Sequence, residues 1–450
     1  MATAATLPVV GPGARDLLRR AGVLSPVLAV LALLLVPGGG GGAEGGTGGT
    51  GTVADAASGL LVLVCLVRVA RGGARPLTRT AAVVLGLPVL GICLAAITSN
   101  DPASSLPGVA RYVQVFVLVP AAVLLTVRDR RDFAVVAWAL VGLALLQGAV
   151  GVAQYLTGTG ASYQGEDIRA VGTFGATDVM GMATVVSYGL VVVTGIALGS
   201  GPGRARTAAL VCAGLLFLPL VLSFSRGAWI ATVFACALQL LLAGPRRAAR
   251  VALAAGALGV VLVGGLGIGS DLVEERVTSI TRVTAAPDQS VTDRYTMWAA
   301  AGEMWRAEPV TGVGLKGFPR YRDAHASVAL SSGSDTAGAG AGFRRQPLLS
   351  PHNMYLLVLS EQGLVGLLAL VGSWTALLVG ALRRRGGTGA DTGFGPGSGP
   401  GADCALVATG LLVWQLVDFF YADIGGPSTV LMAVVFGLAA WWSLVGARRA

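Results

Sequence analysis

Long apolar runs separated by short connections dominate the chain. A helix needs about 20 mostly apolar residues to cross the hydrocarbon core of a bilayer, and about twelve runs reach or approach that length. They lie near residues 22–37, 53–68, 80–98, 109–127, 133–155, 177–199, 207–223, 227–243, 251–270, 353–381, 403–421 and 428–446. Because lipid offers no hydrogen-bond partners to an open backbone, helices are the expected spanning form. The pattern therefore predicts an all-α polytopic membrane protein with about 12 transmembrane helices.

The positions of the arginines predict the orientation of these helices, because short cytoplasmic loops carry an excess of basic residues. Arginine clusters fall in every second connection, near residues 15–20, 68–79, 128–131, 204–206, 246–250, 383–385 and 448–449. The short connections on the other side contain only Arg111, Arg169 and Arg226. We therefore expect a multi-pass protein of a cytoplasmic membrane with both termini in the cytoplasm.

The predicted spans divide the chain into three parts. Residues 1–270 carry about nine spans, and residues 352–450 carry about three. Between them, residues 271–351 form a large loop that this topology places outside the cytoplasm. Within the loop, the segment TDRYTMWAAAGEMWRA at 292–307 predicts an amphipathic helix, and Pro309 ends it. The loop is therefore expected to be partly helical.

Composition agrees with a membrane protein and excludes other classes. Of the 450 residues, 54% are hydrophobic and 12% are charged, whereas soluble domains carry about 25% charged residues. The net charge of +9 does not indicate nucleic-acid binding, because the arginines are scattered between apolar runs and follow the topology. None of the five cysteines forms a CxxC pair, so neither a disulfide framework nor a zinc site is indicated.

Three basic side chains are placed where function is a reasonable hypothesis. Arg226, in SFSRGAWIA, lies between two spans on the side where short connections avoid arginine; it either contacts an anion or extends to water from the interface. His352 lies where the long loop re-enters the membrane, and its segment either carries chemistry or begins a helix. Arg294 starts the loop helix and could also be a solvated charge.

Carboxyl groups gather at the same predicted level of the membrane. Glu361 lies inside the tenth predicted span, and Asp178, Asp418 and Asp423 lie near the outer ends of theirs. Ionisable groups at membrane depth are costly and are functional hypotheses by default. The sequence therefore predicts that any chemistry takes place at the outer surface of the membrane.

The available side chains suit a phosphate-containing substrate. The chain contains no Walker motif, HExxH or GxSxG, so ATP hydrolysis, zinc proteolysis and serine hydrolysis have no sequence signal. Arginine suits phosphate and diphosphate groups, and histidine accepts a proton near neutral pH. A lipid-linked diphosphate attacked by an activated hydroxyl would use these groups without a metal or another cofactor.

At this point the sequence resembles the O-antigen ligase and polymerase superfamily of bacterial membrane glycosyltransferases. The likeness rests on blocks that occur in the family's order and at similar spacing, over roughly residues 170–370. The blocks are GTFGATDVMGM (172–182), SFSRGAWIA (223–231), DRYTMWAAAGEMWRAEPVTGVGLKGFP (293–319) and PHNMYLLVLSEQGLVGLLAL (351–370). The resemblance implies a helical bundle of the GT-C-like class with a large outer loop.

The resemblance also implies an activity and roles for residues. Members take a glycan from undecaprenyl diphosphate at the outer face of the cytoplasmic membrane and pass it to an acceptor hydroxyl. By motif, Arg226 and Arg294 would hold the donor diphosphate. His352 would lie beside the reacting centre, as general base or as a donor to phosphate. The same blocks imply substrate-binding or orienting roles for Trp298, Asn353 and Glu361.

Other functions are compatible with parts of the pattern. About twelve spans with polar groups also describe a secondary transporter, although the ionisable groups cluster near one surface and no inverted repeat is visible. A non-catalytic subunit of glycan assembly is a further alternative. The bias toward Ala, Gly, Val and Arg is typical of high-G+C coding. If the source is a high-G+C actinobacterium, it has no lipid A core to receive a glycan, which favours a polysaccharide polymerase over a ligase. The expected partners are a lipid-linked oligosaccharide, a glycan or other hydroxyl acceptor, and membrane lipids, with no nucleic acid.

Overall fold

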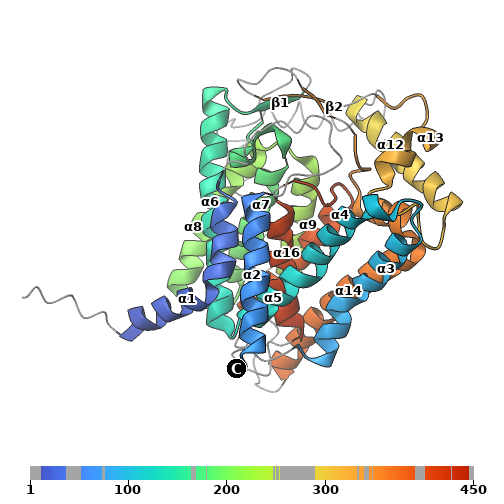
Figure 1. The fold of residues 1–450 in the computed structure, drawn as a ribbon. Helices are drawn as coiled ribbons and strands as arrows, with labels where there is room; N and C mark the ends of the chain where they lie inside the picture. Colours follow the sequence, from blue (N-terminus) through green and yellow to red (C-terminus); the bar gives the residue numbers. More distant parts are fainter. Residues whose placement is uncertain are drawn as a thin grey trace, which may run out of the picture.

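The computed structural model is a bundle of helices (Figure 1). It describes residues 12–36, 52–72, 77–163, 169–178, 180–246, 249, 253, 289–331, 334–338, 344–346, 348–390, 401–426 and 428–444. The helices in chain order are α1 (Pro12–Leu33), α2 (Val53–Ala70), α3 (Arg79–Ile97), α4 (Pro102–Val113), the π-helical turn η1 (Gln114–Leu118), α5 (Val119–Thr126), α6 (Arg130–Thr157), the 3-10 turn η2 (Gly172–Thr177), α7 (Gly181–Leu198), α8 (Gly203–Leu222), α9 (Arg226–Ala243), α12 (Gln289–Ala307), α13 (Phe318–His325), α14 (Met354–Ala390), α15 (Ala402–Asp418) and α16 (Thr429–Leu444).

The predicted apolar runs that fall within the described residues overlap these helices, and the run at 251–270 lies outside them. By length and composition, eight helices of the described part are able to cross a membrane, and two shorter apolar helices accompany them. The chain is therefore built as a polytopic integral membrane protein. The total of about twelve spans and the GT-C-like class stay predictions.

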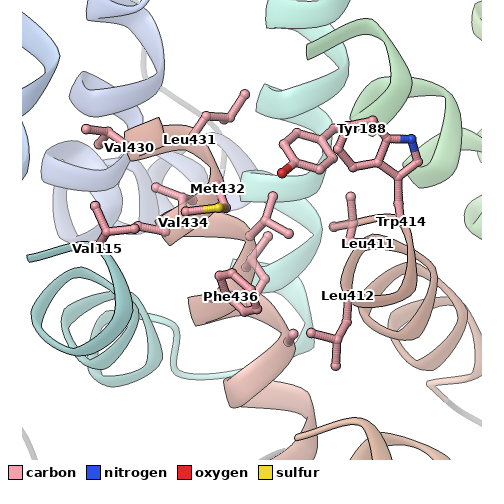
Figure 2. Close-up of a cluster of buried hydrophobic side chains, with 14 of the residues drawn as sticks. Val115, Tyr188, Leu411, Leu412, Trp414, Val430, Leu431, Met432, Val434 and Phe436 are labelled. Carbon is pink, nitrogen blue, oxygen red and sulfur yellow. The ribbon is translucent and has the colours of Figure 1, made fainter. Parts of the chain in front are cut away.

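Helices α7, α15 and α16 form the centre of the bundle. Nearly every residue of α16 is buried, and its Phe436 stacks on Trp374 and Phe419. Figure 2 shows Phe436 among the buried apolar side chains of this core. In contrast, α8 is apolar on its outward side, where Leu215 is 60% and Phe217 is 62% exposed. Apolar side chains on the outer surface of a helix are stable where lipid replaces water. The packing therefore separates a protein core from a lipid-facing rim.

A small sheet at one end of the bundle adds to the expected all-α architecture. Strand β1 (Ala161–Tyr163) pairs antiparallel with β2 (Ser334–Gly338), which pairs antiparallel with β3 (Arg344–Gln346). Ala161 lies opposite Gly338, so the segment after α6 is joined to the segment after α13. Helices α12 and α13 lie at the same end of the bundle as β1 and β2 (Figure 1). The helix predicted at 292–307 is confirmed as part of α12.

Candidate functional site

His352 lies in the turn directly before α14. Its side chain is exposed, and its backbone adopts a left-handed conformation with φ +49°, which is uncommon for residues with a side chain. On one side, Trp298 of α12 donates its indole N–H to the carbonyl of Pro351 at 2.8 Å. On the other side, Asn353 is buried, and its side-chain oxygen accepts from the backbone N–H of Leu356 at 3.1 Å, which caps the start of α14. The turn at His352 is therefore held by hydrogen bonds of the residue before it and of the residue after it.

Asp423 and Arg294 are the charged neighbours of His352. The surrounding protein hinders hydration of the imidazolium and lowers the pKa of His352 below its usual 6.5, although the side chain remains accessible to solvent. Arg294 lowers the pKa further, and Asp423 opposes both effects. The imidazole is therefore neutral at pH 7 and able to accept a proton.

Arg226 is the first residue of α9, and its side chain is exposed. The preceding Ser225 caps the helix, because its hydroxyl accepts from the backbone N–H of Ala228 at 3.3 Å. Among the described residues, the Arg226 guanidinium has no hydrogen-bond or ion-pair partner. An unpaired arginine at the positive end of a helix dipole is suited to bind an anion.

The block at 172–182 lies against the block at 223–231. Gln154 of α6 holds the turn at the start of the first block, because its side-chain oxygen accepts from the backbone N–H groups of Val171 at 3.1 Å and Gly172 at 2.9 Å. The Ser225 hydroxyl contacts the sulfur of Met180 at 3.5 Å. The two blocks therefore contact each other beside the start of α9.

Glu361 is buried where α14 kinks, and it holds the loop that follows α12. Its side-chain oxygen Oε1 accepts from the backbone N–H of Phe318 at 3.2 Å. The backbone N–H groups of Val313 and Gly314 donate to the carbonyls of Ser360 and Glu361 at 2.9 and 3.0 Å. These contacts make a backbone interlock between residues 309–318 and residues 360–364. Glu361 thus stabilises the loop after α12, and Asn353 stabilises the start of α14.

The segment between α15 and α16, residues 419–428, joins these parts, and we call it the α15–α16 connection. The backbone N–H of Met354 donates to its carbonyls at Phe419 (2.9 Å) and Ala422 (3.0 Å). Asp178 accepts from the backbone N–H of Ser428 at 3.2 Å. A Cβ on Gly227 would lie 3.1 Å from the Cβ of Tyr421. The connection therefore contacts the starts of α9 and α14 and the turn before α7.

The structure thus brings some of the sequence-predicted residues together. Trp298 bonds to the residue before His352, Asn353 follows it, and Arg294 lies within electrostatic reach of it. Arg226 is linked to this group through the α15–α16 connection. Sequence reasoning noted Asp423 as a costly charge without assigning it a role, and its only signal was its position near the end of a span.

A family model described as O-Antigen ligase matches residues 211–371. No curated protein matches the chain. The matched range contains Arg226, Arg294 and His352 and three of the four blocks that carry the resemblance, and the block at 172–182 lies before it. The resemblance drawn from the sequence is confirmed over this range.

Proposed function

Because residues 211–371 of this chain belong to the O-antigen ligase family, we propose that the protein transfers a glycan from an undecaprenyl-diphosphate donor to an acceptor hydroxyl. The reaction takes place at the outer face of the cytoplasmic membrane of a bacterium and polymerises or ligates a surface polysaccharide. The observation that carries the proposal is the placement of solvent-accessible His352 before α14, where Trp298 of the helix that carries Arg294 bonds to the preceding Pro351 and the α15–α16 connection links the start of α14 to the start of α9 at Arg226.

In the proposed reaction, the acceptor oxygen attacks the anomeric carbon of the donor glycan. A new carbon–oxygen bond forms while the bond from that carbon to the diphosphate oxygen breaks, and its electron pair leaves with undecaprenyl diphosphate. His352 takes the hydroxyl proton as general base. Arg226 and Arg294 bind the diphosphate and neutralise the charge that develops on it.

The supporting residues have positioning roles in this proposal. Trp298 fixes α12, and with it Arg294, against Pro351. Asn353 sets the start of α14, and Glu361 sets the loop that follows α12. Asp423 stabilises the protonated form of the imidazole through its charge. Correct placement of reacting groups contributes several kcal/mol to catalysis, on the order of 7 to 11 in the most favourable cases.

A direct test follows release of undecaprenyl diphosphate by the purified protein in nanodiscs, with lipid-linked oligosaccharide extracted from the source cells. We expect acceptor-dependent release in the presence of a chelator, and a loss of about 100-fold or more in Arg226→Ala, Arg294→Ala and His352→Ala. A ladder of products would identify a polymerase, and a single product would identify a ligase.

The matched control for this test is Arg306→Ala. Arg306 lies on the same helix as Arg294, is 66% exposed in its side chain and pairs with Glu303. An exposed pair of this kind contributes little to stability, so release should stay at the wild-type rate. Absence of release by the folded wild type, or release unaffected by the three substitutions, would contradict the catalytic assignment and lead to transport assays.

A further inference from the structure

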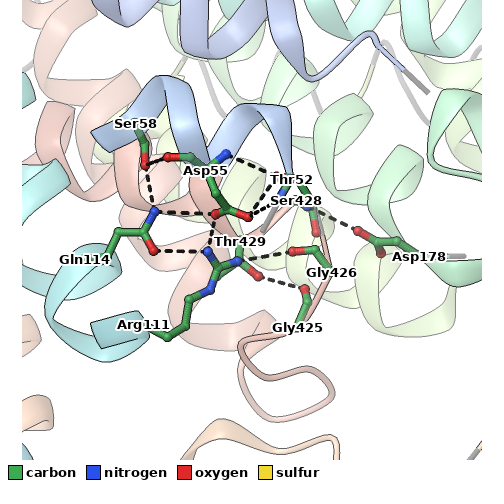
Figure 3. A network of polar contacts seen from close by, with 10 residues as sticks. All are labelled: Thr52, Asp55, Ser58, Arg111, Gln114, Asp178, Gly425, Gly426, Ser428 and Thr429. Atoms are coloured by element: carbon green, nitrogen blue, oxygen red, sulfur yellow. Dashed lines mark hydrogen bonds and ion pairs between the residues drawn. The ribbon is translucent and has the colours of Figure 1, made fainter. Parts of the chain in front are cut away.

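The far end of the α15–α16 connection is held by residues outside the proposed site. Arg111 of α4 donates from Nη2 to the carbonyl of Gly426 at 3.4 Å (Figure 3). From the first residue of α16, the Thr429 hydroxyl donates to the carbonyl of Gly425 in the connection at 2.7 Å. Asp178 accepts from Ser428 on the opposite side. Gly426 is therefore held from α4, and Ser428 from the segment before α7.

Arg111 is itself held by an ion pair between two helices. Its Nη1 atom bonds to the Oδ1 atom of Asp55 on α2, and the side chains are only 21% and 16% exposed. Gln114 accepts from Arg111 at 3.3 Å and donates to the Ser58 hydroxyl at 2.7 Å. Gln114 is also the first residue of the π-helical turn η1, and such turns are frequent at functional sites. The arrangement leaves the guanidinium little freedom to move.

The turn that this network holds lies close in sequence to Asp423. Gly426 comes three residues after Asp423, the carboxylate beside His352. The backbone of Gly426 has φ +70°, and a Cβ there would lie 2.7 Å from Oδ2 of Asp178. The turn therefore has no room to shift toward Asp178. A displacement of the turn would instead move Asp423 and, through Tyr421, the support of Arg226.

We propose that the Asp55–Arg111 pair is a positioning device for the transfer reaction, which holds the α15–α16 connection so that Asp423 stays beside His352. The inference rests on the proposed function. In this proposal neither residue contacts substrate, so their loss should lower kcat and leave donor binding nearly unchanged. Asp55 also caps the start of α2 through Thr52, and an ion pair of this kind is weak evidence for stability, so kcat and not the melting temperature decides the positioning role.

The test measures kcat and KM for release of undecaprenyl diphosphate from extracted lipid-linked oligosaccharide. Arg111→Gln and Asp55→Asn should each lower kcat roughly 10- to 100-fold, as expected for a displacement of about 1 Å, while KM for the donor changes less than about threefold. Arg111→Lys should restore part of kcat. The double variant should be no worse than either single variant, because residues that act as one unit are not additive.

Arg20→Gln is the matched control. Arg20 makes an ion pair of similar type with Asp129 and Asp132, at 2.8 and 2.9 Å, at the opposite end of α6 from the turn at 172–177. It should lower the melting temperature without lowering kcat. A second variant, Thr429→Val, removes the bond to Gly425 without disturbing the ion pair, and it should also lower kcat.

The outcomes separate the two proposals. If the folded wild type releases no undecaprenyl diphosphate, the proposed function fails. If the wild type is active but Arg111→Gln and Thr429→Val keep its kcat, or lose no more than Arg20→Gln, the positioning inference is overturned. A rise in KM without a fall in kcat would also overturn it, because it would place Arg111 in substrate binding. Should Arg111→Gln fail to fold, Thr429→Val and Arg111→Lys give the same decision.

Discussion

Three of the sequence blocks each contain one residue with a strained backbone conformation. Among the described residues, the non-glycine positions with positive φ are Phe224, Lys316 and His352, at +50°, +61° and +49°. Phe224 precedes Ser225 and Arg226, and Lys316 lies in the loop that interlocks with α14. Such conformations cost on the order of 1 to 3 kcal/mol each and persist where surrounding contacts impose them. At His352, the contacts through Pro351 and Asn353 impose it.

The pH dependence of the reaction tests the role of His352. Its pKa is lowered below 6.5, so the neutral imidazole predominates at pH 7. If His352 is the general base, kcat/KM should be level near neutrality and fall as the pH drops through this lowered pKa. Asp423→Asn removes the charge that raises the pKa, so the fall should move to lower pH. An increase in rate at acid pH would instead identify protonated His352 as a donor to phosphate.

The pKa can also be measured without turnover. The chain contains only 2 histidines, so His325→Gln leaves His352 as the only imidazole visible by NMR. His325 lies at the end of α13, and its ring contacts the carbonyl of Tyr321 at 2.9 Å. A titration midpoint at or above 6.5 would contradict the arrangement of charges described for His352.

At the scale of elements, two glycines allow α14 to interlock with the loop after α12. Gly312 and Gly363 have φ of +68° and +62°, and a Cβ on either would lie 2.3 to 2.4 Å from backbone atoms of the other segment. Gly363 is also where α14 departs from helical geometry. The glycines of the TGVG and EQG motifs are thus explained by close backbone approach and by left-handed conformation.

Alanine at either glycine should therefore destabilise the fold. The left-handed strain costs roughly 1 to 2 kcal/mol and the overpacking a further 1 to 3 kcal/mol, so Gly312→Ala and Gly363→Ala should lower the melting temperature strongly. Gly302→Ala is the control, because it lies in helix α12 with nothing within 4 Å of an added Cβ. That change should be neutral or stabilise by up to about 1 kcal/mol. Equal melting temperatures for all three variants would exclude the interlock.

At the scale of the whole molecule, the orientation in the membrane can be tested by cysteine labelling. In a background in which the five cysteines are replaced, Val328→Cys lies on a fully exposed residue after α13, and Arg204→Cys lies on an exposed residue at the start of α8. An impermeant maleimide should label Val328→Cys in intact cells and Arg204→Cys only after permeabilisation. The reverse pattern would invert the topology and place the proposed site on the cytoplasmic face.

The sequence by itself determined the membrane class, the positions of most helices and the resemblance to the O-antigen ligase family that the family model bears out over residues 211–371. Apolar length and the absence of charge decide whether a segment is stable in lipid, and both are local properties of the chain. The blocks around Arg226, Arg294 and His352 were likewise visible as short motifs, and the family match covers them. Their individual roles remain predictions that the release assay tests.

Tertiary structure alone decided how these blocks meet. Glu361 and Asn353, for which the sequence predicts substrate-binding or orienting roles, bond to backbone groups of the interlock and of the start of α14, and those roles stay predictions. The α15–α16 connection contacts several blocks, yet it carries no motif of its own, because its contacts use backbone groups that every sequence possesses. Asp423 comes beside His352 by the same route, since packing, and not spacing along the chain, brings the start of α14 against the end of α15.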